Sequence, residues 1–106
     1  MHIDRVIHEP ARLKIMTALW GVKWADFCSL CGMLELTRGN LSAHVARLER
    51  DGYVQVEKSI IGRMPHTQYR LTRHGRKVLK EYWVAMDEIR ALGPVEPIGT
   101  EQAPRE

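Results

Sequence analysis

The sequence contains little of what several protein classes depend on. Only two of its 106 residues are cysteine, too few for a disulfide framework in so small a domain. No apolar run approaches the roughly 18 residues that a membrane span needs. The first ten residues, MHIDRVIHEP, carry charges where a signal peptide has an apolar stretch. We therefore expect a cytoplasmic protein without a membrane partner.

Patterns that support catalysis or cofactor binding are also missing. No Gly-rich phosphate loop is present, and no nucleophile is grouped with a base at a recognisable spacing. The five histidines are scattered. Cys28 and Cys31 form a C-x-x-C pair, but a zinc site needs four ligands and no second pair exists. We predict no enzyme, no cofactor and no metal. Cys31 falls on the apolar stripe of the second helix and Cys28 at its edge, and we expect a structural role as small hydrophobic residues. A thiol sensor is the alternative.

The positive charge is unevenly distributed along the chain. Residues 38–80 hold ten Lys and Arg against Glu49, Asp51 and Glu57, a net charge of +7, although the whole chain carries only +3. A basic segment of this kind favours a polyanionic partner.

The length is that of one domain, and the sequence predicts two helices in its first third. HEPARLKIMTALWG places Pro10 in a first helical turn and ends the helix at Gly21. WADFCSLCGML, residues 24–34, spaces apolar residues as a second short helix does.

The middle of the chain predicts a third helix and a β-hairpin. Thr37 is a good N-cap for a helix that runs to about Asp51 and stops at Gly52. YVQVEKS and TQYRL alternate as strands do, and we expect IIGRMPH to form a longer loop between them.

A fourth helix is predicted from near Thr72 to about Leu92. The order of three helices, a hairpin and a helix predicts an α+β, mainly α, winged helix-turn-helix. The domain should cover residues 1–92. Residues 93–106 hold three of the five prolines and predict a flexible tail.

The third helix has two different faces. At 100° per residue, Leu41, Val45 and Leu48 share a narrow buried sector. Small residues, Asn and Arg occupy the other side, where they can approach a major groove and contact bases or phosphates.

The stretch LTRGNLSAHVARLERDGYV, with HEPARLKIMTAL before it and GRMPHTQYRLTRHGRK after it, resembles the small winged-helix transcriptional regulators of the MarR/ArsR-like group. The resemblance covers about residues 8–80, and Val45 replaces the usual Leu. It implies a homodimeric, double-stranded-DNA-binding repressor or activator.

These features define the expected DNA-binding residues. Four residues of the third helix should face the major groove: Asn40, Ala43, Arg47 and Arg50. Three should contact the backbone: Thr37, Arg38 and Ser42. His44, on the helix flank, should bond locally or to phosphate. Arg63, at the tip of the wing, should enter a minor groove.

The fourth helix predicts a dimer. Leu79, Tyr82, Met86 and Ile89 step by three and four residues, and Trp83 widens this apolar seam. A domain this small has too little core of its own to cover the whole seam. We therefore expect a second copy of the chain to cover the rest. The alternatives are a winged-helix protein-interaction module and a thiol or metal sensor. The operator, the sign of regulation and any small-molecule effector stay open.

Overall fold

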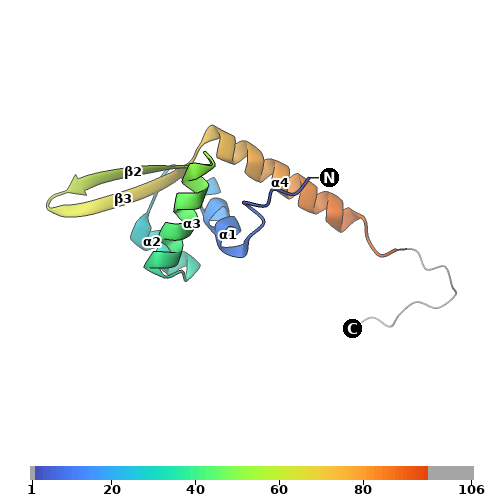
Figure 1. Cartoon of the computed structure of the whole chain (residues 1–106), viewed down its shortest axis with the longest axis horizontal. Coiled ribbons are helices and arrows are strands. Elements are labelled where there is room, and N and C mark those ends of the chain that lie inside the picture. The colour runs from blue at the N-terminus through green and yellow to red at the C-terminus, as the bar shows by residue number, and fades with distance from the viewer. Residues whose placement is uncertain (1, 96–106) are drawn as a thin grey trace.

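The computed structural model describes residues 2–95, and its elements follow the predicted order with one short strand added (Figure 1). The elements are α1 (Pro10–Trp20), β1 (Ala25–Asp26), α2 (Phe27–Leu34), α3 (Arg38–Arg50), β2 (Val54–Ile61), β3 (Met64–Leu71) and α4 (Arg73–Ala91). The predicted α+β winged helix-turn-helix is confirmed. The expected flexible tail lies almost wholly outside the described residues.

Each helix begins at a side chain that accepts hydrogen bonds from the first turn. Thr37 accepts from the backbone N–H of Asn40 at 3.0 Å, as its predicted N-cap role requires. Thr72 accepts from the N–H of Gly75 at 2.8 Å. Asp26 accepts from both the N–H and the hydroxyl of Ser29, and these bonds hold the pKa of the Asp26 carboxyl below its usual value.

The second helix is shorter than predicted. It begins at Phe27 and not at residue 24, because Ala25 and Asp26 pair with Tyr69 and Gln68 of β3. Helical periodicity is a local property, and it carries no information about a strand partner more than 40 residues away. The result is a three-stranded antiparallel sheet in the order β1-β3-β2.

The prediction of a long loop in the wing is also wrong, because a two-residue turn connects the two strands. Ile61 pairs with Met64, which leaves only Gly62 and Arg63 in the turn. Gly62 has a φ of +65°, the left-handed conformation that a type II′ turn needs at its first central residue. The paired strands project from the helical body as a narrow ribbon (Figure 1).

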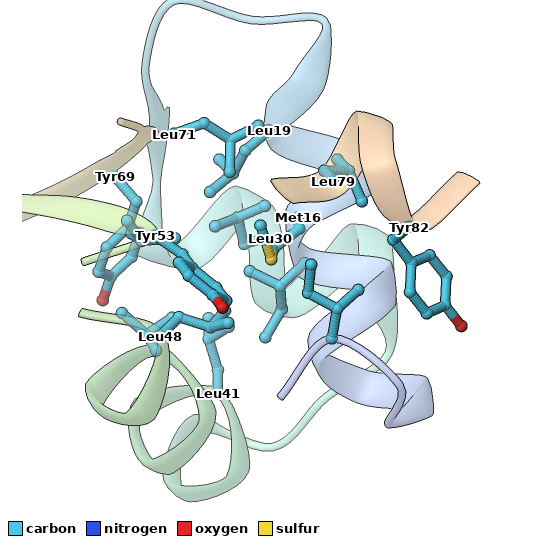
Figure 2. Packing of buried hydrophobic residues seen from close by; sticks show 14 residues of the cluster. Met16, Leu19, Leu30, Leu41, Leu48, Tyr53, Tyr69, Leu71, Leu79 and Tyr82 are labelled. Carbon is cyan, nitrogen blue, oxygen red and sulfur yellow. The ribbon is translucent and has the colours of Figure 1, made fainter. Parts of the chain in front are cut away.

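One apolar core joins the helices to the base of the sheet (Figure 2). Leu41, Val45 and Leu48 are buried in it, as the helical angles of α3 predicted. The largest fully buried side chains from the rest of the chain are Ile7, Ile15, Met16, Leu19, Leu30, Val54 and Leu79. The core therefore fixes one face of α3 and leaves the opposite face to solvent.

The two cysteines differ in their packing. Cys31 is half-buried and packs against the core beside the buried Leu30, whereas Cys28 is exposed. The expectation of small hydrophobic packing is therefore wrong for Cys28. Among residues 2–95, no helix is long and apolar enough to cross a membrane.

Candidate nucleic-acid interface

The solvent face of α3 carries most of the predicted DNA-binding residues. Its buried stripe lies opposite, so the small and basic side chains between the stripe residues are accessible. The exposed residues from the predicted set are Thr37, Arg38, Asn40, Ser42, Ala43, Arg47 and Arg50. Short side chains at three of these positions let the helix approach a surface closely, while the arginines can reach past them.

Two of these arginines have partners within the chain. The Arg38 guanidinium lies 4.9 Å from the centre of the Phe27 ring, a cation–π contact that keeps it at the start of α3. Arg47 Nε donates to Asp51 Oδ2 at 3.1 Å. Both members of that pair are substantially exposed, so the bond is worth at most about 1 kcal/mol and Arg47 can exchange it for a base or a phosphate.

His44 points toward its own chain. Its Nδ1 lies 3.5 Å from Glu9 Oε2 and 3.4 Å from Arg12 Nη1, so it links α3 to the first turn of α1. Burial raises the pKa of the Glu9 carboxyl. Hydrogen bonds from the backbone N–H groups of Arg12 and Ala11, together with the nearby positive charges, outweigh that effect, so the pKa lies below its usual value. Of the two contacts predicted for His44, a local bond and a phosphate bond, the structure therefore shows the local one.

The wing presents Arg63 at its tip, where the side chain is exposed, as the sequence predicted. Lys58 and Thr67, which pair across the hairpin, face a groove whose other wall is Ser42, Ala46 and Glu49 of α3. Lys58 therefore extends the basic surface of α3 onto the sheet.

Two further residues with basic side chains on the ribbon, Arg70 and His66, are less available. Arg70 stacks over the Trp24 ring at 4.8 Å and donates to Gln55 Oε1 at 2.9 Å. His66 is half-buried. The wing also has a feature that the sequence does not predict, three exposed apolar residues near Arg63: Ile60, Ile61 and Met64. The pattern predicts a loop over this segment, and a loop has no strand alternation from which to place their side chains.

The predicted dimer seam is divided between core and surface. Leu79 is completely buried and Tyr82 is 4% exposed, both within their own chain (Figure 2). Trp83 and Met86 are half-buried, and Ile89 is 40% exposed. Leu79 therefore has no accessible surface that a partner could contact. Trp83, Met86 and Ile89 are at least partly accessible.

The described part of the chain contains no cluster of side chains that could bind a metal ion. No group of three or more His, Cys, Asp or Glu side chains is close enough to hold an ion among residues 2–95. Cys28 and Cys31 lie on one helix without a third ligand beside them.

Comparison with known proteins identifies the family. Residues 11–90 match the winged helix DNA-binding domain. An uncharacterized protein of Methanocaldococcus jannaschii is 35% identical over 78 residues, which cover 74% of this chain and 85% of that protein.

Solved structures agree with this match. The transcriptional regulator homologue of Pyrococcus horikoshii superposes with a TM-score of 0.79 and 33% identity, over 86% of this chain and 91% of that one. A putative transcriptional regulator of Salmonella typhimurium has the same fold, with a TM-score of 0.69 and 22% identity over 82% and 77% of the two chains. The chain therefore belongs to the winged helix DNA-binding domain family, and these similarities support a DNA-binding regulator.

Proposed function

We propose that the protein binds double-stranded DNA sequence-specifically, as a homodimer, and regulates transcription. The observation that carries this proposal is the set of exposed basic side chains on α3 and the wing. Arg38, Arg47, Arg50, Lys58 and Arg63 are all exposed, and the acidic residues of the same segment are fewer: Glu49, Asp51 and Glu57. Phosphates would neutralise these cations, and the short side chains between them would let α3 enter a major groove.

Within this surface, the two parts have different tasks. Asn40, Ala43, Arg47 and Arg50 lie on the face of α3 that would meet base edges. Thr37, Arg38 and Ser42, near the helix start, would contact the sugar-phosphate backbone. Arg63 would enter the adjacent minor groove, where A·T-rich sequence is narrow and strongly negative.

The dimer rests on α4. The last of its buried residues is Ala85, six residues before its end. At 100° per residue, Met86 and Ile89 continue the same sector of the helix. Met86 is half-buried against the core, and Ile89 is exposed. Leu92 follows and is 70% exposed. An apolar strip that its own domain leaves uncovered is the surface on which a second copy would pack.

A two-fold dimer would also solve a problem of selectivity. One recognition helix makes only a few base contacts. These are too few to distinguish an operator from the many competing sites of a genome. Two copies would place two α3 helices in successive major grooves about 34 Å apart, so the operator should be an inverted repeat with that half-site spacing.

The experiment is selection of duplexes from a random library by the purified protein, followed by sequencing and by sedimentation of the complex. We expect an inverted repeat bound by two chains. A salt titration on random duplex DNA measures the phosphate contacts separately, because the slope of log affinity against log salt counts them. A pool that stays random after repeated rounds would contradict sequence-specific binding, and a specific site bound by one chain would contradict only the dimer.

A further inference from the structure

The tip of the wing is apolar on both of its faces. Opposed residues of a hairpin share a face, and successive residues alternate between faces. Ile61 opposite Met64 therefore forms one apolar pair, and Ile60 opposite Pro65 forms the other on the reverse face. We name these four residues the apolar collar. Only Gly62 and Arg63 lie beyond it.

The fold does not account for the apolar collar. Ile60, Ile61 and Met64 are 73%, 62% and 70% exposed, and Pro65 is exposed as well. The ribbon leaves the helical body well before its tip (Figure 1), so no core residue packs on the collar in the described part of the chain. A cluster of exposed aliphatic side chains at one point of a monomer marks a contact with another molecule.

The shape of the tip limits what that molecule can be. A two-residue turn makes the end of the ribbon as narrow as two paired strands, about 4.8 Å between backbones. Gly62 and Arg63 form its apex. Ile61 and Met64 follow directly on the two strands, and Ile60 and Pro65 lie one residue further back, about 3.3 Å along each strand. Any partner that receives the cationic apex must therefore also meet the collar.

Resting on the proposed DNA binding, we propose that the apolar collar acts as a wedge in the minor groove of double-stranded DNA. Arg63 enters the groove, and Ile61 and Met64 press into the adjacent base step, which partly unstacks and bends the duplex. Aliphatic side chains of this kind gain apolar contact with exposed base faces, and that gain offsets the cost of unstacking. The step affected should be a flexible pyrimidine–purine step such as TA, where unstacking costs least.

Charge distribution favours DNA over a second copy of the chain as the occupant. Arg63 at the apex is the exposed ionic group nearest the collar. Lys58 lies two residues behind Ile60, and Glu57, which accepts a hydrogen bond from Gln68 at 2.7 Å, lies one residue further back. Two like-charged tips would repel each other if collars met between copies. Phosphates on both sides of a minor groove complement the same charges.

The test uses the full chain on a duplex recovered by selection and follows permanganate oxidation of thymines, which reports unstacked bases. The test variant is Ile61→Ser with Met64→Ser. Met33→Ser is the matched control, because Met33 is 69% exposed on α2, away from the wing. Anisotropy measures binding, and circular dichroism confirms folding of each variant.

We expect a hyper-reactive thymine beside each half-site with the parent and with Met33→Ser. The double wing variant should lower that reactivity at least several-fold and weaken affinity by about tenfold. Bound DNA with no reactive thymine in the parent complex would overturn the wedge while leaving DNA binding intact.

Two other results would also decide against the wedge. A double wing variant that retains the reactive thymine would remove the collar from the contact. A double wing variant that sediments as a monomer where the parent is a dimer would make the collar a chain–chain contact. A parent that binds no duplex at all would overturn the proposed function itself, so the two failures are distinguishable.

Discussion

The backbone carbonyl oxygen of Tyr53 occupies the space in which any side chain on Gly75 would begin. A Cβ built on Gly75 would overlap that oxygen. The same oxygen accepts a hydrogen bond from the N–H of Thr72 at 3.1 Å. The first turn of α4 is therefore seated directly on the backbone at the start of the hairpin, which couples the wing to the helix proposed to hold the dimer.

Gly75→Ala should destabilise the fold strongly. The clash is with backbone and not with a flexible side chain, so α4 must move away from Tyr53 at a cost of about 3 kcal/mol. Urea unfolding followed by circular dichroism measures the change. The control is Gly32→Ala in α2, where a Cβ meets nothing within 4 Å. There the gain in helix propensity should stabilise by about 0.5–1 kcal/mol. Equal effects of the two substitutions would contradict the close approach.

Tyr53 should make the stability sensitive to alkaline pH. Burial, the hydrogen bond that its hydroxyl donates to the Asp4 carboxylate, and the charge of Asp4 raise the pKa of Tyr53 above its ordinary value of 10. Burial also raises the pKa of Tyr69 and of Tyr82. Above pH 10 the unfolded chain thus loses these protons before the folded one, and the free energy of unfolding falls as pH rises toward the folded-state pKa values.

Tyr53→Phe isolates one of these three groups. Each tyrosine contributes a slope of up to about 1.4 kcal/mol per pH unit. The variant should be less stable at pH 7 by about 1 kcal/mol, because the hydrogen bond is lost. Its stability should nevertheless decline less steeply above pH 10. Unfolding curves at pH 7–11 measure both effects, and an unchanged slope would mean that Tyr53 titrates normally in the folded protein.

Arg47 and Arg50 should each contribute to operator affinity. Arg47→Ala or Arg50→Ala should weaken binding by about 1–3 kcal/mol and relax base preference, since both lie on the exposed face of α3. Arg90→Ala is the control, because Arg90 is also exposed and paired with a nearby acid, Asp87, at 2.7 Å. Anisotropy at matched salt compares them. Parental affinity in both α3 variants would rule out α3 as the recognition helix.

Arg63→Ala should reduce affinity more on A·T-rich than on G·C-rich flanking sequence. The narrow groove of A·T tracts concentrates negative potential, so the arginine gains more there. Binding to two duplexes that share one operator and differ only in their flanks measures the difference. An equal loss on both would indicate a phosphate contact without groove entry.

Met86→Glu should convert the dimer to monomers and weaken operator binding at the same time. Met86 is half-buried and lies on the same face of α4 as the exposed Ile89, and a carboxylate buried there between two copies would lack a partner. Val84→Glu is the control, because Val84 is 52% exposed and lies on nearly the opposite side of the helix. Analytical ultracentrifugation compares both with the parent. A parent that stays monomeric at micromolar concentration would end the dimer proposal.

The sequence alone determined the features that depend on neighbouring residues. Thr37 caps α3 because a hydroxyl at that position meets free N–H groups within one turn. The buried stripe of Leu41, Val45 and Leu48 follows from helical geometry, and so does the exposure of Arg47 and Arg50 opposite it. The element order, and the position of Arg63 at the end of the wing, could be predicted for the same reason.

Only the tertiary structure decided the features that depend on residues distant in the chain. The pairing of Ala25 with Tyr69 turned a predicted helical turn into a strand, and the pairing of Ile61 with Met64 shortened a loop into a tight turn. His44 lies near Glu9, and Leu79 lies in the core, because the helices meet there. Periodicity states which face of an element is apolar, but which part of that face the chain itself covers is set by packing, and no local pattern contains that information.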